Sequence, residues 1–172
     1  MMTYTRKARL SDLDAILKIT DQAVAFLASQ DSPQWQGNDG PTRAEFESAI
    51  NAGVAYVLIY DKQVAGVAKL ISGPEAAYDN IDGQWGGDAT TYMTIHRVTV
   101  DGEIRGQGLA QQLLHDLIVI ARERNFTDIR IDTHAVNAIM QHVITKLGFT
   151  YQGMIMLPIA NGERKAYQLI LD

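Results

Sequence analysis

Histidine is the residue type here whose ordinary pKa, about 6.5, suits it to take up and release protons at neutral pH. Two of the four histidines belong to β-like stretches: His96 lies within TYMTIHRVTV, and His134 follows DIRIDT. We predict that His96 is a general base and His134 an acid or a relay. The alternative for His96 is simple packing against a sheet. His115 and His142 are scattered, so the four histidines lack the spacing of zinc ligands, and we predict no metal.

A glycine-rich loop offers a second kind of chemistry, the binding of an anion. Its sequence is Arg105-Gly106-Gln107-Gly108-Leu109-Ala110, and it joins a β-like stretch to an amphipathic one. The start of a helix presents unpaired N–H groups and the positive end of the helix dipole. Glycine lets the backbone approach phosphate oxygens closely. The loop therefore predicts a phosphate site, with an ordinary strand-to-helix turn as the alternative.

Two common phosphate loops do not fit this segment. The dinucleotide fingerprint needs a small residue where Gln111 stands, and its loop follows the first strand of a domain. A Walker loop needs the triplet Gly-Lys-Ser/Thr, which is absent from the chain. The phosphate-loop pattern that the segment does fit has the form Arg/Gln-x-x-Gly-x-Gly/Ala.

Alternation and helical spacing predict the elements that position these residues. The segment 29–41 reads as a long ordered loop with Trp35, and 73–90 reads as a polar, glycine-rich insertion with Tyr78 and Trp85. The whole chain, 1–172, is predicted to be one α/β domain with a mixed sheet. We expect seven strands, at 3–8, 54–60, 64–71, 92–100, 129–133, 149–156 and 165–171. We expect four helices. The first runs from the cap Ser11 to Leu27, the second from the cap Thr42 to Gly53, and the others cover 109–124 and 139–147.

Composition excludes several classes of protein. A formal charge of −5 without a cluster of Lys or Arg argues against nucleic acid as a partner. No apolar run approaches the roughly 20 residues of a membrane span, and the start has no secretory signal, so we expect a cytoplasmic protein. The absence of cysteine excludes disulfides, thiolate metal sites and a cysteine nucleophile.

The stretch from Ile95 to Ala110 resembles motif A of the GNAT superfamily of N-acetyltransferases, through IHRVTV and the following RGQGLA. Asp132-Thr133-His134, Asn137, Met140 and the run Lys146-Leu147-Gly148-Phe149 are similar to the second half of that family's cofactor site. The resemblance covers essentially the full chain. It implies a GNAT-like α/β fold, with a mixed, mostly antiparallel central sheet of about seven strands flanked by about four helices.

The resemblance also implies acetyl-CoA as the cosubstrate. Main-chain groups of Val98, Thr99 and Val100 would pair with the pantetheine arm, and the amides of residues 105–110 would hold the pyrophosphate. Asn137 and Met140 would lie beside the pantetheine. For Asn137 the alternative is to cap a helix, a role that suits asparagine and does not exclude the other.

The implied reaction is transfer of an acetyl group to the amine of a small molecule or peptide, by direct attack in a ternary complex. His96 occupies a position similar to that of the family's proton relay, on a face that alternation shares with Val98 and Val100. Many relatives carry a tyrosine acid where this chain has Ile144. A non-catalytic module that binds or senses acetyl-CoA therefore stays open as an alternative. Transfer of a longer acyl group is a second alternative, within the enzymes.

By the same resemblance, the two long loops border the acceptor pocket. Trp35, Tyr78 and Trp85 would then form an apolar or cation-binding wall for the amine, or they simply cover the core. Exposed terminal strands and the habit of the family also suggest a homodimer.

Overall fold

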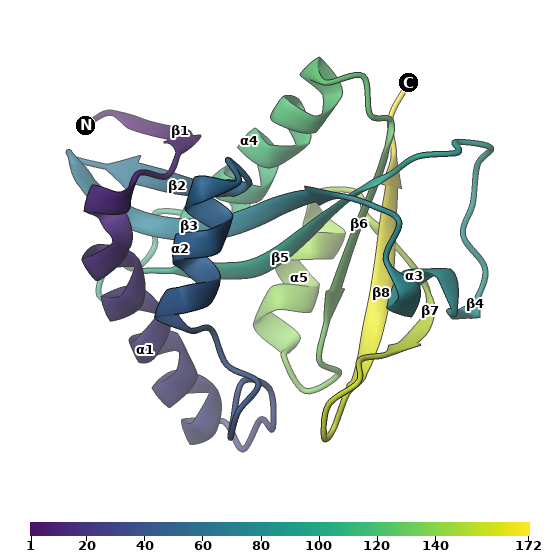
Figure 1. The fold of residues 1–172 in the computed structure, drawn as a ribbon, viewed down its shortest axis with the longest axis horizontal. Helices are drawn as coiled ribbons and strands as arrows, with labels where there is room; N and C mark the ends of the chain where they lie inside the picture. The colour runs from purple at the N-terminus through teal and green to yellow at the C-terminus, as the bar shows by residue number, and fades with distance from the viewer. The chain divides into compact units, whose positions relative to one another are not determined.

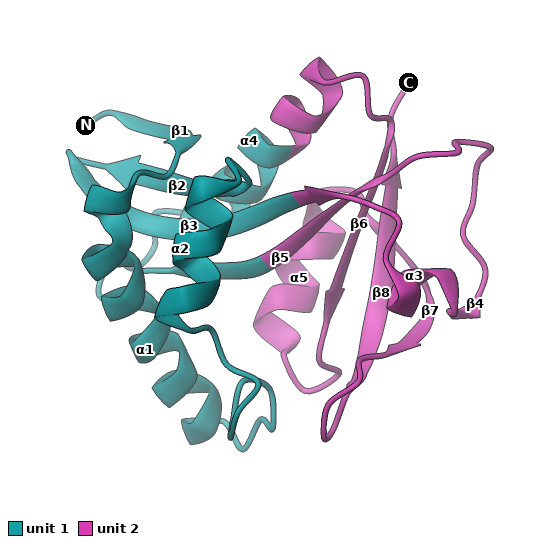
Figure 2. Cartoon of the chain, viewed as in Figure 1, with its two compact units in different colours: residues 1–70, 97–117 teal, residues 71–96, 118–172 magenta.

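A computed structural model describes all residues, 1–172, and divides them into two compact units (Figures 1 and 2). Unit 1 comprises Met1–Leu70 and Arg97–Leu117, and unit 2 comprises Ile71–His96 and Ile118–Asp172. Each unit therefore consists of two separate pieces of chain. Three elements contribute residues to both units: strands β3 (Gln63–Ser72) and β5 (Met93–Val100) and helix α4 (Leu109–Glu123). That residues 1–172 form one domain stays a prediction.

Unit 1 is built on an antiparallel arrangement of strands β1, β2 and β3, with helices α1 and α2 packed on it (Figure 1). The central strand is almost continuously apolar, AYVLIY, as expected for a strand covered on both faces. Ile16 of α1, Phe46 of α2 and Val57 of β2 are fully buried in its core. The elements are β1 (Thr3–Lys7), a 3₁₀ turn η1 (Leu10–Asp12), α1 (Leu13–Ser29), α2 (Arg43–Asn51) and β2 (Ala55–Tyr60).

The two helix starts of unit 1 show one confirmed and one wrong prediction. Thr42 caps α2 as expected, because its hydroxyl accepts the N–H of Glu45 at 3.1 Å. Ser11 does not cap α1, which begins after the 3₁₀ turn. Instead, the Asp12 carboxylate accepts the N–H of Arg9 at 2.7 Å and pairs with Arg6 at 2.8 Å. An ion pair across the turn thus replaces the hydroxyl cap.

Unit 2 contains strands of both directions (Figure 1). β5 pairs in parallel with β6 over residues 93–95, whereas β6 with β8, β7 with β8, and β4 with β7 are antiparallel. The mixed, mostly antiparallel fold class is therefore confirmed. The further elements are α3 (Ala76–Asp79), β4 (Asp82–Gly83), β6 (Asp128–Thr133), α5 (Ala138–Lys146), β7 (Thr150–Met156) and β8 (Glu163–Ile170).

The insertion 73–90 is more ordered than its composition suggests. It contains α3 and β4, which is why the chain has eight strands and five α-helices where about seven and four were expected. Tyr78 is fully buried, and its ring lies 5.6 Å from that of Trp85, stacked, and 6.2 Å from that of Tyr92. Packing of these three aromatic rings, two of them buried, stabilises a segment that has little secondary structure propensity of its own.

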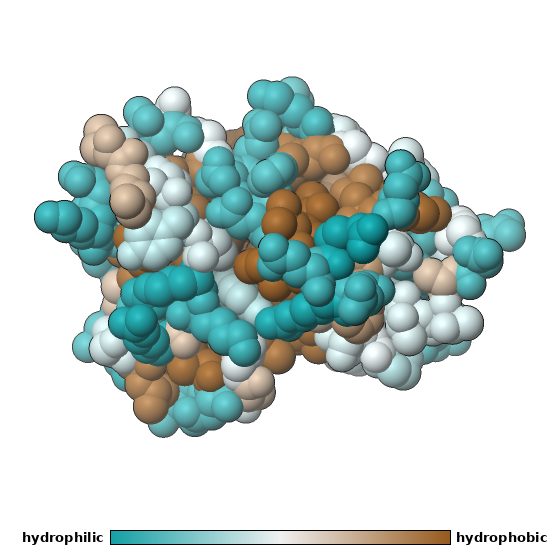
Figure 3. Space-filling view, turned by 90° about the horizontal axis from the view of Figure 1, so that it is seen from above, coloured by the Kyte–Doolittle hydropathy of each residue, from teal (hydrophilic) through white to brown (hydrophobic).

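The surface carries hydrophobic areas between hydrophilic side chains, as Figure 3 shows for one face. The exposed large hydrophobic residues include Tyr151 and Met156 of β7 and Ile170 of β8. No helix of the protein combines the length and the apolar character needed to cross a membrane.

Candidate active site

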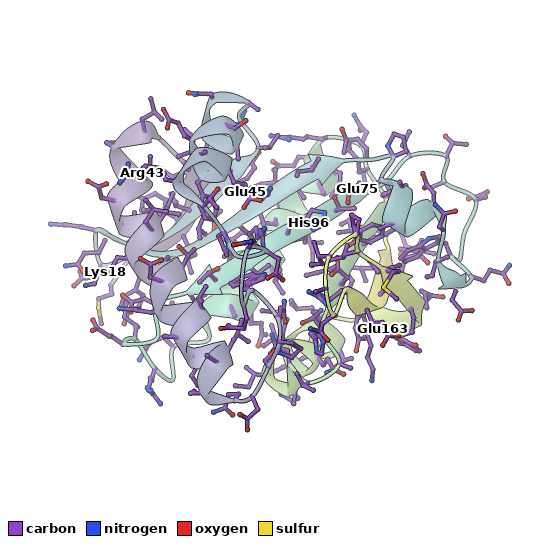
Figure 4. The ribbon with its side chains drawn as sticks, turned by 60° about the horizontal axis from the view of Figure 1, so that its bottom comes forward. Lys18, Arg43, Glu45, Glu75, His96 and Glu163 are labelled. Atoms are coloured by element: carbon purple, nitrogen blue, oxygen red, sulfur yellow. The ribbon has the colours of Figure 1, made fainter.

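His96 lies on β5, where its ring contacts a carboxylate from the 73–90 segment (Figure 4). Its Nε2 atom is 2.8 Å from one oxygen of Glu75 and 3.0 Å from the other. The hydroxyl of Thr94 also donates to Glu75. Both partners are partly accessible, with 23% of the His96 side chain and 26% of the Glu75 side chain exposed. The pair can therefore exchange a proton with a molecule that arrives from solvent.

Glu75 is held in place through its backbone as well as its side chain. It is the N-cap residue of α3, and its N–H donates to the hydroxyl of Tyr92 at 2.7 Å. That hydroxyl in turn donates to Asp79 at 3.1 Å. The carboxylate beside His96 is therefore part of an ordered hydrogen-bond network.

A second carboxylate, that of Asp132 at the end of β6, faces the other side of the His96 ring. Nδ1 of His96 lies 3.9 Å from Asp132 Oδ2, which also accepts the hydroxyl of Tyr78 at 2.6 Å. Burial raises the pKa of Tyr78 well above its ordinary value, and the negative charge of Asp132 adds to this effect. Tyr78 consequently stays protonated and serves as a donor that fixes Asp132.

The aromatic rings of this region already contact a cation of the chain itself. The guanidinium of Arg130 lies 4.1 Å from the centre of the Trp85 ring and 3.9 Å from that of Tyr92, and it pairs with Asp128 at 2.7 Å. Trp85 Nε1–H also donates to the Tyr78 carbonyl at 2.8 Å. These contacts give Tyr78 and Trp85 a structural role, and contact with the acceptor stays a prediction for both.

Unit 1 holds a separate charged cluster around Arg97. Its guanidinium makes two hydrogen bonds to Glu45, of 3.0 and 3.1 Å, and one of 3.0 Å to the Asp39 carbonyl. The Lys69 ammonium lies 3.6 Å from Glu45. Trp35 packs its ring against Arg97, 5.6 Å from centroid to guanidinium carbon. The predicted binding residue Trp35 thus anchors the 30–42 loop to β5, and its contact with an acceptor stays a prediction.

Arg97 also interrupts the regular pleat of β5. Its φ of 57° is in the left-handed region, and the pairing of β5 with β6 ends at Ile95. The common face that alternation assigns to His96, Val98 and Val100 therefore does not continue through residue 97. Val98 and Val100 are half-buried, and Thr99 is buried and donates its hydroxyl to the Arg97 carbonyl at 3.1 Å. Pairing of 98–100 with pantetheine stays a prediction.

The glycine loop is exposed, and its two glycines have left-handed backbone conformations. Gly106 and Gly108 have φ values of 70° and 64°, and a Cβ at each would meet no atom within 4 Å. Helix α4 begins directly afterwards at Leu109, and its first turn is closed by the N–H of Gln112 on the Gly108 carbonyl at 3.0 Å. Residues 105–108 are exposed, Leu109 is buried and Ala110 is half-buried. The loop thus presents an open helix N-terminus, which fits a pyrophosphate.

The remaining predicted residues lie around the start of α5. Asn137 caps this helix, because its Oδ1 accepts the N–H of Met140 at 3.2 Å, so the capping alternative is confirmed. Contact of Asn137 and Met140 with the cofactor stays a prediction. Nδ1 of His134 accepts the N–H of Val136 at 3.2 Å. Burial lowers the pKa of His134 and the charge of Arg164 lowers it further, against the opposing charge of Glu163. These effects favour the neutral form of His134, and its role as an acid or a relay stays a prediction.

Sequence reasoning missed the two carboxylates that contact His96. Asp132 carries a usable signal, because it lies one residue before the end of a buried strand. Glu75 lies in the polar insertion, where acidic residues are ordinarily solvated, and no local pattern distinguishes it. At the position of the missing tyrosine, Ile144 is fully buried in the core.

Comparison with known proteins identifies the family of the chain. The model of the acetyltransferase (GNAT) family matches residues 21–149. A GNAT-family acetyltransferase from Streptococcus agalactiae 2603 is 38% identical over 99% of this chain and 96% of its own, with a TM-score of 0.90. No curated protein matches the chain.

More distant structures share the same fold. A putative acetyltransferase from Staphylococcus aureus Mu50 is 26% identical over 98% of this chain and 99% of its own, with a TM-score of 0.73. A chain of the NatC complex bound to Gag peptide and CoA is 14% identical over 100% of both chains, with a TM-score of 0.71. On the family model and the 38% identical structure, the chain belongs to the acetyltransferase (GNAT) family.

Proposed function

We propose that the protein transfers the acetyl group of acetyl-CoA to the amine of a small molecule or a peptide, in a ternary complex. The observation that carries the proposal is the contact of His96 with Glu75 on one side and its proximity to Asp132 on the other. A histidine between two carboxylates is an arrangement suited to proton removal from a cationic amine. The presence of CoA in the NatC structure, which shares the fold, supports the choice of cosubstrate.

The residues around the glycine loop fit acetyl-CoA. The amides of 105–110 would hold the pyrophosphate, and main-chain groups of Val98 and Val100 would hold the pantetheine. When bound, acetyl-CoA supplies the acetyl group as a thioester, whose carbonyl a neutral amine can attack. The positive φ values at Gly106 and Gly108 support this assignment, because few other residues adopt them without strain.

The chain must make the amine neutral before it can react. An alkylamine has a pKa of about 10 and is mostly protonated at neutral pH. His96 takes one proton from the ammonium group, which becomes a neutral amine as the imidazole becomes an imidazolium ion. The adjacent carboxylate of Glu75, 2.8 Å away, stabilises that positive charge.

A non-catalytic module that binds or senses acetyl-CoA is the second candidate, favoured by one observation. Ile144, at the position of the usual tyrosine acid, is fully buried and has no proton to donate. Positioning of the reactants and stabilisation of the oxyanion can still accelerate transfer without that acid.

An assay of thiol release distinguishes these functions. Because the chain has no cysteine, a thiol reagent detects only released CoA. A panel of primary amines and short peptides is offered with acetyl-CoA and with longer acyl-CoAs. Acceptor-dependent release from acetyl-CoA supports the enzyme, whereas binding without release by any acceptor supports the sensor. Faster release from a longer acyl-CoA would move the assignment to that acyl group.

A further inference from the structure

We propose that Glu75 is a positioning residue that fixes the tautomer of His96, so that Nε2 carries the proton and Nδ1 receives the proton of the acceptor amine. This inference rests on the proposed function, because it names the atom of His96 that acts in the reaction. It also identifies a residue of the 73–90 insertion as part of the proton-transfer apparatus.

The hydrogen bonds of Glu75 determine which ring nitrogen is protonated. An ionised carboxylate can only accept hydrogen bonds, and both of its oxygens lie within 3.0 Å of His96 Nε2. The hydroxyl of Thr94 lies within hydrogen-bond distance of the same carboxylate and of the Ile71 carbonyl oxygen. Nε2 must then carry a hydrogen, and neutral imidazole has only one N–H. The lone pair that can accept a proton is therefore on Nδ1.

The surroundings of Nδ1 fit a cationic donor. The nearest acidic oxygen is Asp132 Oδ2 at 3.9 Å, too far for a direct hydrogen bond. This oxygen already accepts the hydroxyl of Tyr78, so Nδ1 and Oδ2 are two acceptors that face each other. A primary ammonium group has three N–H donors and can bond both atoms. The site thus fits an acceptor that arrives as an alkylammonium ion with at least two N–H groups.

The charges that face His96 have the same sign. Glu75 and Asp132 flank the ring, and the Tyr78 ring makes a T-shaped contact with it, with ring centroids 6.0 Å apart. Transfer leaves the charges balanced: the N–H bond of the ammonium breaks, an N–H bond forms at Nδ1, and the new imidazolium keeps its Nε2–H bond to Glu75. The neutral amine remains beside Asp132.

The test is ¹⁵N NMR of the histidine-labelled full chain without acetyl-CoA or amine, at a pH where His96 is neutral. We expect Nε2 of His96 to be protonated and Nδ1 to be bare. In Glu75→Gln the amide can donate to Nε2, so the population should shift toward Nδ1–H. With acetyl-CoA and an active amine, kcat should fall by about tenfold or more while KM for acetyl-CoA stays unchanged.

Glu123→Gln, an exposed carboxyl change near the end of α4, is the matched control and should leave both the tautomer and kcat as they are. The proposal is overturned if wild-type His96 carries its proton on Nδ1, or if Glu75→Gln keeps both the tautomer and kcat. A melting curve verifies that Glu75→Gln is folded. If no amine promotes CoA release while Nε2 is protonated, the proposed function fails and the tautomer assignment to Glu75 is supported.

Discussion

Arg97 and Trp35 both have backbone φ angles in the left-handed region, 57° and 63°, and their side chains pack against each other. Non-glycine residues adopt this region at a cost, which surrounding contacts must offset. The two hydrogen bonds from Arg97 to Glu45 supply such contacts. The irregular part of β5 that follows His96 is therefore maintained by side chains of α2 and of the 30–42 loop.

Comparison of Arg97→Ala with Arg97→Gly tests this strain. Both variants lose the Glu45 and Trp35 contacts and should be less stable than the wild type. Glycine adopts a φ of 57° freely, so Arg97→Gly should be more stable than Arg97→Ala by about 1 kcal/mol. Urea unfolding measures the difference. In a regular strand the order would be reversed, because glycine is the weaker strand residue.

Gly108 allows a test of the phosphate site with two substitutions of equal size. Asparagine tolerates a φ of 64°, and space exists for its side chain, so Gly108→Asn should retain much of the acetyl-CoA binding. In Gly108→Asp a carboxylate would repel the pyrophosphate. Acetyl-CoA at a hundredfold excess over Kd should stabilise the wild type by about 2.7 kcal/mol. Thermal shifts would reject the loop assignment if the Asp variant kept the full effect.

His96→Ala tests the role of the imidazole itself. If His96 removes the amine proton, turnover at neutral pH should fall by about 10²-fold or more. The loss should shrink as the pH rises toward the amine pKa, because more of the amine is then neutral without help. The stabilisation by acetyl-CoA should stay nearly unchanged. A lower melting temperature with no pH-dependent change in rate would indicate a packing histidine and move the role to His134.

Asp12 should make folding stability depend on pH in the acid range. The hydrogen bond from Arg6 lowers the pKa of the Asp12 carboxyl, against burial and with support from the Arg9 amide. Its contribution is therefore complete above the unfolded pKa, about 3.9, and is lost as the pH falls through the lower folded value. Asp12→Asn should be less stable than the wild type at pH 7, and the two should converge in acid.

Asp14→Asn is the control for this experiment. Asp14 also pairs with an arginine, Arg43 at 2.7 Å, but 89% of its side chain is exposed. A surface ion pair of this kind contributes little, so the variant should match the wild type within about 0.5 kcal/mol. A loss of stability equal to that of Asp12→Asn would show that the effect of Asp12 does not come from burial of its ion pair with Arg6.

A homodimer is the expected oligomeric state, on the basis of the terminal strands and of the resemblance. Tyr151, Met156 and Ile170 expose large hydrophobic side chains on β7 and β8. Sedimentation velocity at micromolar concentration should show twice the monomer mass, and Tyr151→Lys should reduce it. A monomer would refute the dimer and leave the active-site argument as it is.

Local patterns were sufficient for much of the fold and for the positions of two helix caps and the glycine loop. The cap at Thr42, the cap at Asn137 and the glycine loop before Leu109 all depend on residues within a few positions of each other. Such signals act through backbone hydrogen bonds and φ preferences, which neighbouring residues determine. They failed at Ser11, because the helix start is fixed by Asp12 instead. Its partner, Arg6, is six residues away, on the preceding strand.

The cluster of Glu75, His96, Asp132 and Tyr78 depended on contacts between residues that are distant in the sequence. Glu75 is 21 residues before His96, and Tyr78 is 54 residues before Asp132. Periodicity cannot bring such pairs together, because it reports only which face of an element is apolar. The sequence by itself determined the class of fold, and it predicted the anion loop and His96 as a candidate base. The tertiary structure alone decided which carboxylates face that base, because burial of Tyr78 orders the polar insertion beside β5.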